Sequence, residues 1–192
     1  MTNQELLNLY NLESYLLETV SPRFHSQGYL NAFDFFCIVI WKANRAKTKI
    51  AQRLIKYGSD LDQVVIQMTR ELHSQESDKE RCRCLSETWG FRLPMASAIL
   101  TILFPETFTV YDVRVCDMLN RFHNIAEIPN FNRRWEQYQL YVINVQAAVP
   151  EVLNLRDKDR VLWAESFATQ LTKDIKSVFT RGEEPENDYR YN

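Results

Sequence analysis

The chain has little glycine and little cysteine, and each shortage excludes some classes of fold or site. It contains four glycines and four cysteines among 192 residues. Proteins rich in tight β-turns need glycine where φ is positive, so the shortage argues against an all-β fold. The cysteines at positions 37, 82, 84 and 116 lack metal-ligand spacing and lie in no Cys-rich loop. We expect buried free thiols, and we predict neither a metal nor a cofactor.

Long hydrophobic runs and leader patterns are also missing. The longest uninterrupted apolar run, residues 35–41, is too short to span a bilayer. The first thirty residues show no basic-then-apolar signal pattern, so we expect a soluble, cytoplasmic protein with no membrane partner. No Ser/His/Asp pattern, Walker loop or dinucleotide fingerprint is present, and His25, His73 and His123 are too far apart in sequence to indicate a metal site.

Charge is unevenly distributed along the chain. The net charge is −2 and the pI is about 6.0, which is unusual for a nucleic-acid binder because duplex affinity comes largely from neutralised phosphates. Residues 41–57, however, contain no acid, and residues 183–192 are mainly acidic. The basic segment carries Lys42, Arg45, Lys47, Lys49, Arg53 and Lys56.

The apolar residues recur mostly at helical spacing. Residues 4–18, 61–72, 76–89 and 135–149 each carry one apolar stripe, and a last helix starts at Asp157 or Asp159 with a face of Trp163, Phe167, Leu171, Ile175 and Val178. Residues 35–41 also suit a buried strand. No breaker separates them from residues 42–57, so we expect one long helix or two abutting ones, closed by Gly58. The predicted fold class is all-α, with one helical domain at 1–180 and a flexible acidic tail at 181–192.

Residues 89–115 carry the most distinctive pattern in the chain. Gly90 interrupts two helical patterns, and Pro94 suits the first turn of the next helix. Residues 95–104 are almost entirely apolar, which predicts a helix buried on all sides. Pro105 ends it, and Asp112 is well placed to cap a helix over 113–122.

This order of elements resembles the helix-hairpin-helix/Gly-Pro-Asp superfamily of base-excision DNA glycosylases, and most closely a bacterial branch similar to 8-oxoguanine glycosylases. Weaker similarity lies around residues 41–45 and 155–163. Arg92 departs from the pattern, because it stands where a second hairpin glycine would lie. The matching residues are Gly90, Pro94, Ala96, Ala98, Pro105, and Asp112 followed by Val113, Arg114 and Val115.

The resemblance implies roles for several of these residues. Asp112 takes the place of the active-site aspartate, whose carboxylate stabilises positive charge on the sugar. Gly90, Arg92 and Leu93 would present backbone N–H groups, and the Arg92 charge, to a phosphate. Pro94 stands where bifunctional members carry a nucleophilic lysine, and residues 91–107 contain no lysine. We therefore predict a monofunctional enzyme that uses water.

Other residues suit a base pocket or a phosphate contact, and each also has a structural interpretation. Trp41 and Tyr111 are flat walls for an extruded base, although both also suit the core. Lys42 and Arg45 are phosphate contacts or a solvated face. Arg114 contacts a phosphate or pairs with Asp117, and for this residue we favour the structural pair.

Two functions follow from these patterns. The first is a monomeric DNA glycosylase that hydrolyses the bond between a damaged or modified base and deoxyribose. The alternative is a non-catalytic helix-hairpin-helix module that binds nucleic acid or a protein partner. The enzyme requires Asp112 at the floor of a cleft lined by Trp41, Lys42 or Tyr111, whereas the alternative predicts Asp112 capped and inaccessible.

Overall fold

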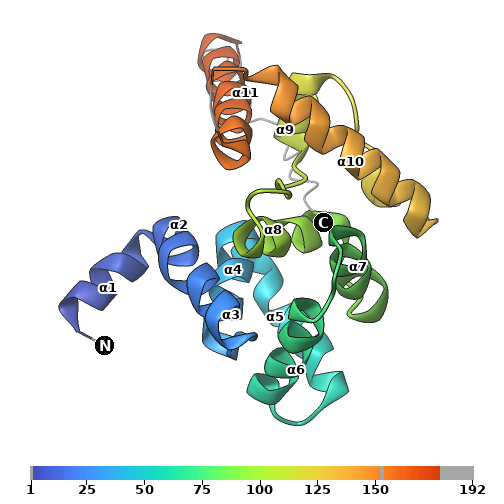
Figure 1. Cartoon of the computed structure of the whole chain (residues 1–192). Helices are drawn as coiled ribbons and strands as arrows, with labels where there is room; N and C mark the ends of the chain where they lie inside the picture. Colours follow the sequence, from blue (N-terminus) through green and yellow to red (C-terminus); the bar gives the residue numbers. More distant parts are fainter. Residues whose placement is uncertain (1, 152–153, 178–192) are drawn as a thin grey trace.

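A computed structural model describes residues 2–151 and 154–177, and within these ranges the chain forms helices and loops without strands (Figure 1). The all-α prediction is confirmed. Val178 and the predicted acidic tail lie outside the described residues. The helices are α1 Asn3–Tyr10, α2 Leu12–Tyr15, α3 Ser21–Gln27, α4 Ala32–Ala43, α5 Lys47–Leu54, α6 Leu61–His73, α7 Asp78–Arg83, α8 Leu93–Leu103, α9 Val113–Leu119, α10 Phe131–Ala148 and α11 Leu155–Ser177, with π-helical segments at Leu16–Val20 and Cys84–Thr88 and 3₁₀ turns at Asn44–Ala46, Ile55–Tyr57 and Ile125–Glu127.

The ambiguous stretch after residue 31 is helical. Helix α4 ends at Ala43, and the 3₁₀ turn Asn44–Ala46 leads into α5, so the prediction of abutting helices is confirmed and the strand interpretation is wrong. Gly58 closes this region as expected, since its N–H donates to Ile55 O at 3.3 Å at the end of the 3₁₀ turn Ile55–Tyr57. Gly58 is extended, with φ of 177°, and the side chain of Asp60 caps α6 by accepting a hydrogen bond from Asp62 N at 2.9 Å.

Two helix boundaries near the site differ from the prediction. Helix α9 ends at Leu119 rather than at residue 122, because Asn120 and Phe122 adopt positive φ values of 49° and 77°. Helix α11 begins at Leu155, before either predicted aspartate, because Asn154 Oδ1 accepts a hydrogen bond from Asp157 N at 2.8 Å.

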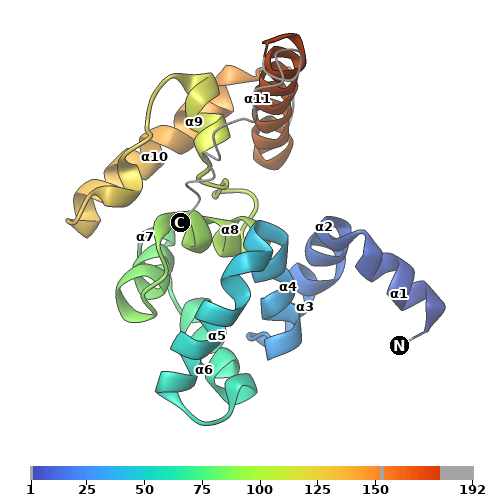
Figure 2. The ribbon, with the colours of Figure 1, turned by 180° about the vertical axis from the view of Figure 1, so that it is seen from behind.

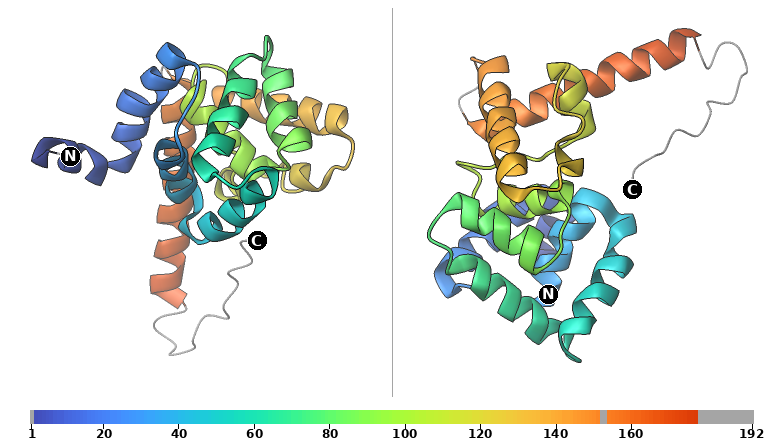
Figure 3. Two further views of the ribbon diagram at one scale, coloured as in Figure 1. Left: turned by 90° about the horizontal axis from the view of Figure 1, so that it is seen from below. Right: turned by 90° about the vertical axis from the view of Figure 1, so that its right-hand side faces the viewer.

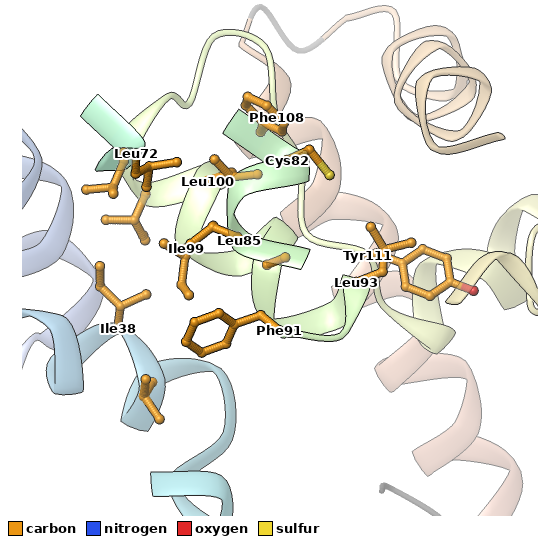
Figure 4. Packing of buried hydrophobic residues seen from close by; sticks show 14 of the residues in the cluster. Ile38, Leu72, Cys82, Leu85, Phe91, Leu93, Ile99, Leu100, Phe108 and Tyr111 are labelled. Atoms are coloured by element: carbon orange, nitrogen blue, oxygen red, sulfur yellow. The ribbon is translucent and has the colours of Figure 1, made fainter. Parts of the chain in front are cut away.

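Helix α8 forms the centre of the core, as its composition predicts. Its side chains from Ala96 to Leu103 are buried, and it packs against α3, α4 and α7. Figure 4 shows Leu93, Ile99 and Leu100 of α8 among side chains from the neighbouring helices. Gly90 turns the chain into α8 with φ of +66°, a conformation that favours glycine. The four cysteines are buried free thiols, as predicted.

The chain crosses once from a lower group of helices, α2 to α8, to an upper group, α9 to α11, through residues 104–112 (Figures 1 and 2). Helix α10 fixes this link. Tyr138 Oη donates to Thr109 O at 2.6 Å, and Tyr141 Oη donates to Val110 O at 2.7 Å. Ser97 Oγ of α8 accepts from Tyr111 N at 2.9 Å. The backbone just before Asp112 is therefore held from both groups.

Two helices extend beyond the packed body, α1 at one end and the later turns of α11 at the other (Figure 3). The apolar residues predicted for the last helix do lie along α11, but their side chains are exposed and not buried. Within the described part of the chain, the exposed fraction is 39–53% for Trp163, Phe167, Leu171 and Ile175. No described helix combines the length and apolar character needed to cross a membrane.

Candidate active site

Asp112 is held by both of its carboxylate oxygens. Oδ1 accepts a hydrogen bond from Arg114 N at 3.1 Å, so Asp112 caps α9 as predicted. Oδ2 accepts from Lys42 Nζ at 2.6 Å, although Lys42 lies on α4. The two side chains remain 19% and 16% exposed, so the ion pair is partly shielded but still open to solvent.

This ion pair lies in a cavity of about 480 Å³ between the two groups of helices. The size falls within the range of small-molecule sites. Its wall is built from α2, the end of α4, the link before α9, and the first turns of α11. The lining residues are Glu13, Trp41, Lys42, Val110, Asp112, Arg156, Asp159, Arg160, Trp163 and Ala164.

Two tryptophans give the cavity flat apolar walls. The guanidinium of Arg156 lies 5.1 Å from the Trp41 ring centre. Trp163 stacks on Phe167 with ring centres 5.6 Å apart and an interplanar angle of 8°. Arg114 lies over Trp163 at 5.4 Å. Aromatic faces flanked by cations suit a planar, polar ring such as a nucleobase.

Arg156 joins two carboxylates on the cavity wall. Its Nη2 lies 2.5 Å from Glu13 Oε1, and its Nη1 donates to Asp159 Oδ2. Asp159 is only 2% exposed. Burial raises the pKa of Asp159 to about 6, and the negative charge of Asp112 raises it too, whereas Arg156 and Lys42 lower it.

The structure brings together only some of the residues singled out from the sequence. Trp41, Lys42 and Asp112 share the cavity. Tyr111 does not line it: Tyr111 is 5% exposed, and its hydroxyl lies 2.6 Å from Phe122 O, so the assignment of Tyr111 to the base pocket is corrected to a core role. Arg45 is exposed and lies outside the cavity lining.

The predicted pairing of Arg114 with Asp117 is wrong. Asp117 Oδ1 instead lies 2.8 Å from His123 Nε2. Arg114 points toward α11, where its guanidinium covers Trp163 and also lies 5.7 Å from the Phe167 ring centre. Arg114 is therefore next to the cavity, because it contacts Trp163, which forms part of the cavity wall.

The hairpin before α8 is formed but stands apart from the cavity lining. Leu93 is a core side chain at 4% exposure, and the guanidinium of Arg92 pairs with Glu127. Arg53 Nη1 donates to Gly90 O at 2.6 Å and braces the turn. The backbone hydrogen bonds of α8 begin at Met95 N and Ala96 N, which both donate to Arg92 O. The N–H groups of Arg92 and Leu93 come before these and take no part in the hydrogen bonding of the helix.

Sequence reasoning missed the half of the cavity that α11 supplies. Arg156, Asp159, Arg160 and Trp163 recur at spacings of three and four, so a helix places them on one face. That spacing was a usable signal once a helix was expected there. Glu13 carried no signal, because it is a lone acid that breaks an apolar stripe.

Comparisons of the chain with protein-family models, with curated proteins and with solved structures find no match. The function is therefore inferred from the arrangement of the residues themselves.

Proposed function

We propose that the protein is a DNA N-glycosylase of the helix-hairpin-helix type that hydrolyses the bond between a damaged or modified base and deoxyribose. The observation that carries the proposal is the position of Asp112. Its carboxylate caps α9, yet it also lines a cavity with Trp41 and Lys42. This is the arrangement that the enzyme requires and that a purely structural cap does not.

Asp112 supplies the charge that this reaction needs. Breaking an N-glycosidic bond builds positive charge on the sugar, and a fixed carboxylate beside C1′ stabilises that charge. The start of α9 orients the carboxylate, because Arg114 N donates a hydrogen bond to its Oδ1. Lys42 donates to Oδ2 and so holds the second oxygen in place.

The tryptophans supply a place for the base. An enzyme that acts on a base within a duplex must extrude it into a pocket with apolar faces and polar edges. Trp41 and Trp163 provide the faces, and Arg156 and Asp159 provide donors and acceptors along the wall.

The DNA backbone would be bound outside the cavity. The turn at Gly90 and the start of α8 offer N–H groups to a phosphate, as in the family that the sequence resembles. Arg45 and Lys49 are exposed cations on the basic segment. Lys42, in contrast, is occupied by Asp112 and is better suited to the cavity than to a phosphate.

The reaction type is proposed to be monofunctional. Pro94 lies in the first turn of α8 and has no amine. The amine of Lys42 lies beside Asp112, but it is engaged in a hydrogen bond to the carboxylate and so is not free to attack C1′. Water is then the nucleophile, and the strand remains intact at the abasic site.

The test is a panel of duplexes that each carry one modified base, incubated with the protein and then treated with alkali. We expect strand breaks after alkali for at least one base, and we expect Asp112→Asn to abolish them. Asp60→Asn is the matched control, because Asp60 caps α6 without lining the cavity. A protein that releases no base from any duplex would contradict the proposal.

A protein-binding role is the second candidate, and the exposed stripe on α11 favours it. Leu171 and Ile175 are 39% and 53% exposed, which is typical of a helix face with a partner. Under this function the duplex panel yields no base release. A Leu171→Ser, Ile175→Ser variant would then lose its partner while its melting temperature is unchanged.

A further inference from the structure

The cavity contains two aspartates in different surroundings. Asp112 has a hydrogen-bond donor on each oxygen. Asp159 has Arg156 on Oδ2, and within residues 2–151 and 154–177 no protein donor reaches its Oδ1. A carboxyl that is 2% exposed, with one oxygen unpartnered, can hold a proton on that oxygen.

We propose that Asp159 is the general acid of this cavity, delivering a proton from Oδ1 to the departing base while Asp112 stabilises the sugar. The inference rests on the proposed function and adds a second catalytic residue to it. It follows from the geometry, because both carboxyls line the same cavity. Both oxygens of Asp112 accept hydrogen bonds, whereas Oδ1 of Asp159 accepts none from the part of the protein that the structure describes.

The electrostatics of the cavity agree with this division of roles. When one carboxyl of a site acts as a general acid and another as a charged stabiliser, their surroundings must give the two groups different pKa values. Burial is the largest influence on Asp159 and raises its pKa to about 6, near the pH at which a general acid is most effective. The charged and titratable groups that share its cavity or interact with it electrostatically are Glu13 on α2, Lys42 on α4, Asp112 before α9, Tyr138 and Tyr141 on α10, and Arg156 and Arg160 on α11.

The C1′–N bond breaks, and its electron pair goes to the base nitrogen. The proton of Asp159 moves to the base, which leaves as a neutral molecule, and Asp159 becomes a carboxylate held by Arg156. Water adds to C1′ and loses a proton, which returns the carboxyl to its protonated form. The net reaction consumes one water.

This role implies a class of substrate. A purine that already carries a positive charge departs without added protonation, so a built-in acid is useful for uncharged purines. These bases offer N3 or N7 as proton acceptors at the edge of the ring. We therefore assign the cavity to an uncharged modified purine.

The test is the single-turnover rate of base release between pH 5 and pH 8. The probes are duplexes that carry 8-oxoguanine, hypoxanthine or ethenoadenine, and the rate is measured for the base released fastest. We expect the wild-type rate to fall about tenfold per pH unit above pH 6. Asp159→Asn should lower the rate at pH 6 by about 10²- to 10⁴-fold and remove this slope. Asp157→Asn is the matched control, because Asp157 lies on the same helix outside the cavity lining and should keep the wild-type profile.

The outcomes separate the two proposals. Base release with the same pH profile in Asp159→Asn overturns the general acid and leaves the glycosylase intact. Release of charged or pyrimidine bases alone also overturns it. No release from any duplex defeats the glycosylase and the acid together. If Asp159→Asn does not fold, a wild-type rate that is independent of pH from 5 to 8 overturns the acid.

Discussion

Lys42 Nζ lies 2.6 Å from Asp112 Oδ2, although 70 positions separate the two residues in the sequence. The contact joins the end of α4 to the cap of α9 across the boundary between the two groups of helices. It shows that a basic segment interpreted as a phosphate-binding face contributes its first lysine to the interior of the site.

Replacing Asp112 separates its capping role from its charge. Asparagine keeps the cap, so Asp112→Asn should lose only about 1–2 kcal/mol of stability, from the half-shielded ion pair. Asp112→Ala should lose about 1 kcal/mol more, because the cap is lost as well. Both variants should lose at least about 10²-fold in base release. Urea unfolding and single-turnover assays measure the two effects.

The control for that comparison is Asp60→Ala, which removes an exposed cap far from the cavity. It should cost about 1 kcal/mol and leave base release unchanged. An Asp112→Asn variant with wild-type activity would show that Asp112 acts only as a cap.

Borohydride trapping tests the reaction type. Lys42 forms an ion pair with Asp112, so no covalent protein–DNA adduct should form when the protein is incubated with borohydride and a duplex from which it releases the base. Gel electrophoresis should show an intact abasic strand. An adduct that disappears in Lys42→Gln would instead identify Lys42 as an amine nucleophile and the protein as a bifunctional enzyme.

Reversing charge on the exposed basic segment should weaken DNA binding without unfolding the protein. Arg45 and Lys49 are exposed, so Arg45→Glu, Lys49→Glu should change stability by less than about 1 kcal/mol. If each contacts one phosphate, the slope of log K against log salt should decrease by about 2. Lys173→Glu, on the far part of α11, is the matched control and should keep the wild-type slope. An unchanged slope in the double variant would exclude this segment from the interface.

Local signals gave most of the helices correctly, and the errors have identifiable causes. Pro94 and the apolar run after it located the start and burial of α8, because both effects act within one helix. Gly58 was correctly placed at the end of the segment before α6, and the side chain of Asp60 caps the start of α6. The π-helical segment Cys84–Thr88, closed by Trp89 N donating to Cys84 O at 3.1 Å, was not predicted, because the spacing of apolar residues does not distinguish a single π turn from an α turn.

The stability of the protein should depend on pH through Asp159. Its pKa is raised to about 6 in the folded protein from an ordinary 3.8, so the folded state binds more protons than the unfolded state between these values. Stability should therefore fall as pH rises from 4 to 6, by up to about 3 kcal/mol. Urea unfolding from pH 4 to pH 7 should show a flatter curve for Asp159→Asn. Parallel curves for the two proteins would contradict this assignment.

The site was harder to predict than the fold, because its residues meet only through tertiary packing. Asp112 was chosen through the family resemblance and Trp41 through its aromatic face beside cations, and both line the cavity. Tyr111 had the same chemistry and an equally good sequence position, but its hydroxyl is used by the backbone of the turn after α9. No single-residue signal distinguishes Trp41 from Tyr111.

The contact between Arg156 and Glu13 spans 143 positions, and it closes the cavity wall. During synthesis the amino-terminal helices emerge and pack first, since a chain leaves the ribosome in order. The growing chain therefore has Trp41 and Lys42 in place long before the wall that α11 supplies. A nascent chain that ends before residue 155 lacks Arg156, Asp159, Arg160 and Trp163, so the cavity has all of its walls only once the last helix has been made.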